Sequence, residues 1–230
     1  MKKTFSVLAL SVLVVTSGLY GQQAAATPAP SQLSVELLRD LPAQATFVGY
    51  VDVQKLFQSP AVASLIDDHL FDQLGDGLGL NLRRDIQHLT FFAAMKDGKL
   101  DQGAAVLRGR FDRARILTLL QTHLFKAQSH NGSEIYVSPE SSGDLRAVAM
   151  FDEQVAVVGD LAGVQAVVDA RRLGNAGAGA NAALVAMIGY VRPQDSFWVT
   201  GSLESILPVA LGAVSPLAKL PLPPLRSVLV

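Results

Sequence analysis

Four histidines and the carboxylates beside them are the residues of this sequence best suited to metal or acid–base chemistry. His69 and Asp72 share one face of a predicted helix, and Asp68 and Asp76 lie close by in the chain. Metal sites generally gather ligands from more than one tight cluster, so this group is interpreted as a solvated acidic helix surface. The other histidines stand singly, without zinc-binding spacing: His88, His123 and His130. We therefore predict no metal site.

Motifs for nucleophilic catalysis and phosphate binding are also missing. Neither Gly-x-Ser-x-Gly nor Ser-x-x-Lys occurs, because Ser215 and Lys219 are one position too far apart for the second motif. The run Gly174–Gly179 follows a predicted helix rather than a strand and lacks a lysine, so it is interpreted as a linker. We predict no catalytic and no cofactor-binding residue and favour a non-enzymatic protein. A dispersed Ser-His-Asp triad, with His69 or His88, is the alternative.

Two further features have simple structural interpretations. Trp198, the only tryptophan, could stack on a ligand, but its place in an alternating strand favours core packing. Asn131-Gly132-Ser133 matches the glycosylation acceptor pattern and is interpreted as a turn.

The N-terminus has the form of a secretory signal peptide. Lys2 and Lys3 precede the apolar run Phe5–Val15, which is too short to span a bilayer, and small and polar residues follow as far as Gly21. Cleavage after Gly21 is preferred, and cleavage after Ala26 is the alternative. We therefore expect an exported protein, periplasmic or secreted.

Charge and composition narrow the partners. Removing Lys2 and Lys3 leaves 17 basic and 20 acidic residues, a net charge of −3. This balance disfavours nucleic acid and anionic membranes as main partners, although it leaves room for a local basic patch. The chain has no cysteine, so its core must hold without disulfides. Between Glu204 and Lys219 the apolar stretch is too short to span, so no transmembrane segment is expected in the mature chain.

Periodicity and capping residues predict the elements. Asp97-Gly98 marks a tight hairpin, while Asp112 and Asp160 cap helices. In the helix after Asp112 the apolar stripe is Ile116, Leu117, Leu120 and Leu124. The predicted order is helix 34–40, strand 46–53, helix from Ser59, strands 88–95 and 103–108, helix after Asp112, strands 134–137, 145–151 and 154–159, helix after Asp160, and helix 182–189.

This order predicts an α+β fold, a largely antiparallel sheet with helices packed on one face. The expected organisation is a signal peptide at 1–21, a disordered linker at 22–32, the α+β domain at 33–173, a Gly/Ala-rich linker at 174–181, and the start of a possible second repeat at 182–230.

A faint internal repeat motivates that last segment. At an offset of 150 residues, Gln44 and Phe47 align with Gln194 and Phe197, and each pair opens an aromatic strand. Leu225–Val230 would then lie opposite Ile86–Phe91 as the next strand. Under this hypothesis the second copy is truncated at Val230; the simpler interpretation is a C-terminal strand that completes the sheet.

The segment Leu41-Pro42-Ala43 before strand 46–53, together with Val155–Asp160 opening a valine-rich helix, resembles bacterial exported proteins of a family of unknown function. Repeats in that family begin with a Leu-Pro-Ala-Asp-like approach to a strand, and Gln44 stands here in the place of the aspartate. The resemblance implies an exported or envelope location.

These features favour a non-enzymatic binding or structural module that contacts another protein or a cell-envelope component through a sheet edge or helix face. One alternative is an exported hydrolase with a dispersed catalytic site. Another is an envelope protein anchored by an uncleaved Phe5–Val15 segment.

Overall fold

The computed structural model contains one eight-stranded antiparallel sheet with the strand order β4-β5-β6-β7-β3-β2-β1-β8. It describes residues 37–58, 80–97, 99–139, 146–174, 179, 181–189 and 195–201. The strands are β1 (Phe47–Asp52), β2 (Ile86–Lys96), β3 (Lys99–Gly109), β4 (Lys126–His130), β5 (Ser133–Val137), β6 (Arg146–Met150), β7 (Val155–Asp160) and β8 (Phe197–Gly201). The helices are α2 (Val53–Gln58), α5 (Leu82–Asp85), α6 (Arg113–Thr122), α7 (Leu161–Leu173) and α8 (Ala182–Gly189), with a further helical turn at 37–40. The predicted α+β class is confirmed.

The β2–β3 hairpin forms the centre of the sheet, as the sequence predicted. Its strands are longer than expected, because the ladder continues to the pair Lys96 and Lys99 at the turn. Asp97 has a φ of 53°, the left-handed conformation that tight hairpin turns require. The same chemistry forms the β4–β5 turn, where Asn131 and Gly132 have φ values of 49° and 85°. The interpretation of Asn131-Gly132-Ser133 as a turn is thus confirmed.

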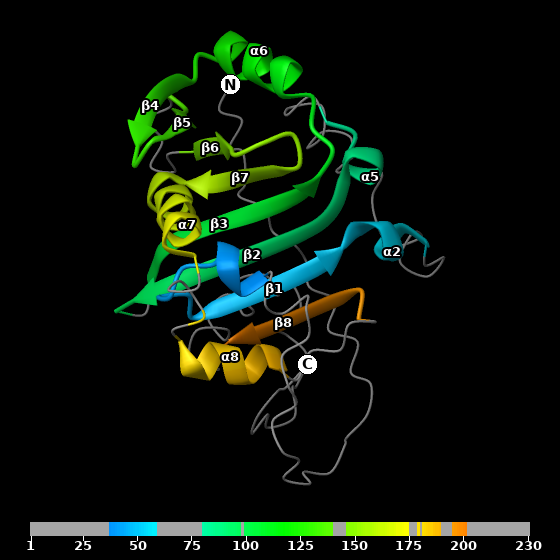
Figure 1. The fold of residues 1–230 in the computed structure, drawn as a ribbon, viewed down its shortest axis with the longest axis vertical. Coiled ribbons are helices and arrows are strands. Elements are labelled where there is room, and N and C mark those ends of the chain that lie inside the picture. Colours follow the sequence, from blue (N-terminus) through cyan, green and yellow to red (C-terminus); the bar gives the residue numbers. More distant parts are fainter. Residues whose placement is uncertain are drawn as a thin grey trace, which may run out of the picture.

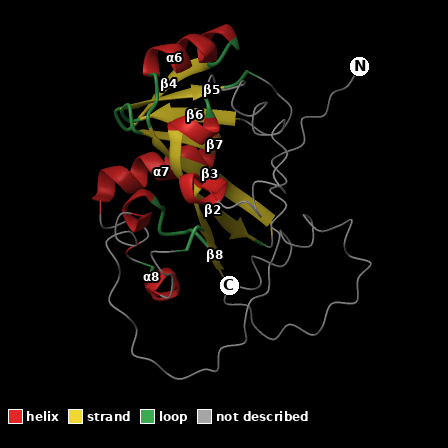
Figure 2. Cartoon of the chain, turned by 90° about the vertical axis from the view of Figure 1, so that its right-hand side faces the viewer, coloured by secondary structure: helices red, strands yellow, loops and turns green. Residues whose placement is uncertain are grey.

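One face of the sheet carries the main hydrophobic core. Val48, Val106 and Val157 from the strands pack in one cluster with residues of α7, α8 and the turn at 37–40. Figures 1 and 2 show α7 and α8 on this same side of the sheet. The helix 182–189 was predicted with the bounds that α8 has.

A second cluster lies on the other face. It joins Ile116 and Leu120 of α6 with Tyr136 and Val148 of β5 and β6. Because side chains alternate along a strand, each strand contributes to both clusters. The structure therefore adds a helix on the face that the sequence left uncovered.

Helix α7 has the caps that the sequence predicted. Asp160 accepts a hydrogen bond from the Gly163 N–H over 2.6 Å, and Gly174 closes the helix with a φ of 61°. Gly163 also lies against Gly103 of β3, where an added Cβ would come within 2.5 Å of the Gly103 carbonyl oxygen. The glycine therefore sets how closely α7 approaches the sheet.

Three local expectations were wrong. Helix α2 begins at Val53, whereas the sequence predicted a strand to that residue and a helix only from Ser59. Strand β4 was not predicted, because its residues are almost all exposed and show no apolar alternation. Leu124 belongs to no helical stripe: it follows the end of α6, has a φ of 61° and is 70% exposed.

Several predicted segments lie outside the described residues. They are the signal peptide at 1–21, the linker at 22–32, the helix from Ser59, most of the linker at 174–181, and residues 202–230. Among the helices that are described, none has both the length and the apolar character needed to cross a membrane.

Candidate functional site

A groove rimmed by arginines lies at the end of the sheet where β3 leads into α6. Its volume is about 470 Å³. A neighbouring hollow of about 510 Å³ shares Phe111, Asp112 and Glu153 with it, so the two form one continuous surface, called here the arginine groove. Its lining residues are Leu80, Arg84, Asp85, Arg110, Phe111, Asp112, Arg113, Ala114, Arg115, Leu117, Glu153 and Gln154.

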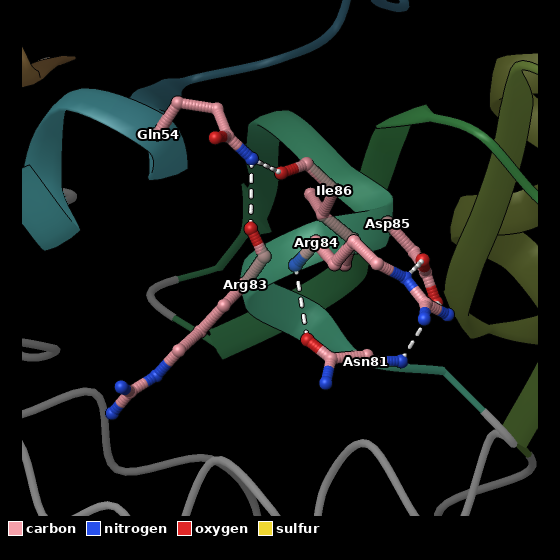
Figure 3. Close-up of polar contacts among 6 residues, drawn as sticks. All are labelled: Gln54, Asn81, Arg83, Arg84, Asp85 and Ile86. Carbon is pink, nitrogen blue, oxygen red and sulfur yellow. Dashed lines mark hydrogen bonds and ion pairs between the residues drawn. The ribbon is translucent and has the colours of Figure 1, made fainter.

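The short helix α5 forms one wall of the arginine groove and is fixed by side-chain hydrogen bonds. The Asn81 Oδ1 atom accepts from the Arg84 N–H over 3.0 Å, while the Asn81 N–H donates to Asp85 Oδ2 over 2.8 Å. The Gln54 Nε2 atom donates to the carbonyl oxygens of Arg83 and Ile86, at 2.8 and 3.0 Å (Figure 3). These bonds satisfy backbone groups that a single helical turn leaves unpaired.

Arg84 and Asp85 form a two-point ion pair on that wall. The Arg84 Nε atom donates to Asp85 Oδ1 over 2.7 Å, and Nη2 donates to Oδ2 over 3.3 Å (Figure 3). The hydrogen bond from Arg84 lowers the pKa of the Asp85 carboxyl, and the Arg115 charge adds to this effect. The pairing neutralises this acid as a repulsive group in the groove.

The opposite wall is the junction between β3 and α6. The Arg110 N–H donates to the Asp85 carbonyl oxygen over 2.7 Å, and the Phe111 N–H donates to that of Glu153 over 2.8 Å. At Gly109 an added Cβ would come within 1.8 Å of the Asp85 carbonyl oxygen, so only glycine allows this approach. Phe111 is buried and forms an apolar floor.

Helix α6 presents two more arginines in its first turn. Asp112 caps this helix by accepting from the Arg115 N–H over 3.0 Å. Arg110, Arg113 and Arg115 are all exposed. Across the part of the chain that the structure describes, their guanidinium groups make no hydrogen bond or ion pair. Three forked cationic donors therefore face solvent around an apolar floor.

This arrangement is chemically suited to binding. Guanidinium groups bind carboxylates in a planar, two-point geometry. No serine, histidine or cysteine lines the arginine groove, so it contains no nucleophile and no general base of the usual kinds. Acids alternate with the arginines, since Asp112 and Glu153 also line it, and this mixture favours a ligand with separate negative charges over a dense polyanion.

The sequence analysis did not identify this site. The arginines come from two segments that neighbour each other only through the sheet, at residues 83–84 and 110–115. The density of arginine in those two segments was the available signal.

The candidates that the sequence did single out have varied positions. Residues 68, 69, 72 and 76 lie outside the described residues, as do Ser215, Lys219 and most of Gly174–Gly179. Within the described ranges, no three histidine, aspartate or glutamate side chains gather as a metal site requires.

Trp198 packs in the core, as predicted. It is 3% exposed and stacks on Tyr50, with ring centroids 5.7 Å apart. His88 lies on the other side of Tyr50, with its ring centroid 5.9 Å away. Burial, with a smaller contribution from Asp52, raises the pKa of Tyr50 to about 12.

His130 was predicted to stand alone and does not. Its Nε2 atom lies 3.0 Å from Asp169 Oδ1, which also accepts from the Asn131 Nδ2 atom over 2.6 Å. The contact joins the β4–β5 turn to α7. Within the described chain, no serine hydroxyl completes this pair as a triad, so the pair is interpreted as a structural contact.

A second arginine cluster surrounds the buried carboxylate of Asp40. Arg108 of β3 donates to its Oδ2 atom, Arg171 of α7 donates to Oδ1 over 3.0 Å, and Arg39 approaches Oδ1 to 3.7 Å. Burial lowers the pKa of Arg171, and the Asp40 charge opposes that shift. Because Asp40 fills the space between the two guanidinium groups, this cluster is structural.

Comparison with known proteins gives only distant likenesses. No family model and no curated protein matches the chain. Crystal form I of the Treponema protein TP0453 aligns with a TM-score of 0.37 and 10% identity over 60% of this chain and 51% of that one. Crystal form III aligns with a TM-score of 0.35 and 12% identity over 60% and 52%. The chain thus spans about half the length of TP0453.

Proposed function

We propose that this protein is an exported, non-enzymatic binding module whose arginine groove binds an acidic segment of a partner protein. The observation that carries the proposal is the set of three exposed guanidinium groups, those of Arg110, Arg113 and Arg115, around the apolar floor at Phe111. A peptide that alternates carboxylates with apolar side chains complements both features.

The charge of the whole chain supports a protein partner over other anions. The mature chain is acidic overall, so a long polyanion or an anionic membrane would be repelled away from the groove. Asp112 and Glu153 add local repulsion against uniform negative charge. Separate carboxylates at spaced positions avoid these acids.

The proposal predicts a loss of binding when the groove loses its charge. We expect a fluorescein-labelled peptide of alternating Glu and Leu to bind about tenfold more weakly to the triple variant Arg110→Gln/Arg113→Gln/Arg115→Gln. The estimate takes about 0.5 kcal/mol for each exposed charge pair. Fluorescence anisotropy at low and high salt gives the two affinities, and high salt should remove most of the difference.

A matched variant removes the same charge elsewhere on the surface. Lys96→Gln/Lys126→Gln/Arg172→Gln changes three exposed cations that do not line the groove. Equal binding by the groove variant and the wild-type chain, or equal losses in both variants, would contradict the proposal. Tighter binding of polyphosphate than of the peptide would show that the groove takes a dense polyanion.

The export component rests on Lys2, Lys3 and the apolar run Phe5–Val15. We expect N-terminal sequencing of the exported protein to begin at Gln22, with Thr27 as the alternative. An N-terminus that retains Phe5–Val15 would instead support an uncleaved anchor.

A further inference from the structure

The ladder between β1 and β8 has a definite centre. Its pairs are Phe47 with Gly201, Val48 with Thr200, Gly49 with Val199, Tyr50 with Trp198, and Val51 with Phe197. An antiparallel pair has a local two-fold axis at each such position, and each axis relates the strands by a different offset in residue number. The axis at the central pair carries residue 49 onto residue 199, which is an offset of 150.

This offset is the one at which the sequence repeats itself. Gln44 and Phe47 align with Gln194 and Phe197 when the chain is shifted by 150 residues. A shift to either neighbouring axis would give 148 or 152 and lose these identities. The register of the ladder therefore agrees with the repeat, although the two observations are independent of each other.

The packing of the two segments obeys the same symmetry. A two-fold axis perpendicular to a sheet keeps both copies on the same face. Leu38 in the helical turn at 37–40 and Ile188 in α8 are 150 residues apart, and both are buried in the core cluster on one face. Val48 and Trp198, also 150 residues apart, belong to the same cluster.

The symmetry has a consequence for the outer edge of β8. Strand β1 pairs with β8 on one side and with β2 on the other. The edge of β8 that corresponds to the β2 side of β1 faces away from β1, and among the described strands none pairs with it. Figure 1 shows β8 at this end of the sheet.

We propose that residues 182–201 begin a second copy of the unit at 37–52, and that the outer edge of β8 pairs antiparallel with residues 225–230 of this chain. This segment reads Leu-Arg-Ser-Val-Leu-Val, with one charge, which suits a strand that is covered on its faces. The connection through residues 202–224 is comparable with residues 53–85 between β1 and β2. Pairing covers backbone groups that an apolar edge would otherwise expose to other chains.

The proposal fixes a register that disulfide trapping can test. Tyr50 lies opposite Thr90 in the β1–β2 ladder. The counterpart of Tyr50 is Thr200, and the counterpart of Thr90 is Leu229 when residue 225 is placed over residue 86. Because the chain has no cysteine, the variant Thr200→Cys/Leu229→Cys contains a single possible intramolecular pair.

We expect this full-chain variant to form an intramolecular disulfide in air at least tenfold faster than Thr200→Cys/Leu225→Cys. In the second variant the cysteine lies four residues along the strand, about 13 Å away. Mass spectrometry of peptides from the non-reduced protein gives both rates. Equal rates would overturn the proposal, and so would a disulfide-linked dimer of Thr200→Cys alone, which would place a second copy of the chain on this edge.

Hydrogen exchange provides a second test that needs no cysteine. Leu229→Pro removes a backbone donor from the proposed strand. We expect amides at residues 198–200 to exchange at least tenfold faster in this variant, while amides of β6 keep their wild-type rates. Unchanged exchange in β8 would overturn the proposal, as would an equal increase in β6.

Discussion

At the scale of single residues, the Asp40 carboxylate connects three separate parts of the chain. It belongs to the helical turn at 37–40 and binds Arg108 of β3 and Arg171 of α7. The Arg171 guanidinium also lies 4.3 Å above the Phe151 ring centroid, which fixes its position. Asp40 is 2% exposed, so its removal would leave two mostly buried cations without a counter-charge.

Substituting this residue should be costly for stability. We expect Asp40→Ala to lower the free energy of unfolding by about 3 kcal/mol, because breaking one partner out of a buried pair leaves the other charge uncompensated. Urea denaturation measures the change. Arg39→Ala is the matched control: its side chain is 49% exposed, so the expected loss is under about 1 kcal/mol. Equal losses for the two variants would contradict this account.

Neither arginine cluster could be predicted from the sequence. Asp40 lies 68 residues from Arg108 and 131 from Arg171, and no local pattern relates positions so far apart. The arginine groove has the same origin, since the fold brings α5 beside the β3–α6 junction. By contrast, the capping roles of Asp112 and Asp160 depend only on the next three residues, and both were predicted.

At the scale of elements, the sequence predicted those whose residues carry their own periodicity. The β2–β3 hairpin and helices α6, α7 and α8 have apolar patterns with recognisable ends, and the structure contains them. Strand β4 forms because β5 offers a partner and not because its own residues are apolar. Helix α2 follows a strand without a separating turn residue, so the sequence gave no sign of the change at Val53.

The contact between α7 and the sheet leads to a prediction at this scale. An added Cβ at Gly163 would lie within 2.5 to 2.9 Å of three backbone atoms of Gly103, and backbone cannot move aside as a side chain can. We expect Gly163→Ala to lower the free energy of unfolding by about 2 kcal/mol, even though alanine favours helices over glycine. Thermal or urea denaturation checks the result.

Gly179→Ala is the control for that substitution, because nothing lies within 4 Å of the position of its Cβ. We expect this variant to be as stable as the wild-type chain. Stabilisation by Gly163→Ala would show that α7 does not depend on this close approach.

At the scale of the whole molecule, the sheet combines two kinds of order. Its eight strands form one antiparallel surface, and the β1–β8 pair at one side relates two segments that are 150 residues apart. The arginine groove lies at the β3–α6 junction, away from that pair in the strand order. A chain that is acidic overall thus concentrates exposed guanidinium groups in one place, and net charge alone could not reveal this.

The binding role of the arginine groove can be tested most directly by NMR. The mature chain, labelled with ¹⁵N, is titrated with the alternating Glu-Leu peptide and its amide spectrum is recorded. The account predicts that the largest shifts fall at residues 84–85, 110–115 and 153–154, and that a Lys-Leu peptide of equal length causes none of them. Shifts concentrated on another surface, such as β4 or the outer edge of β8, would contradict the account.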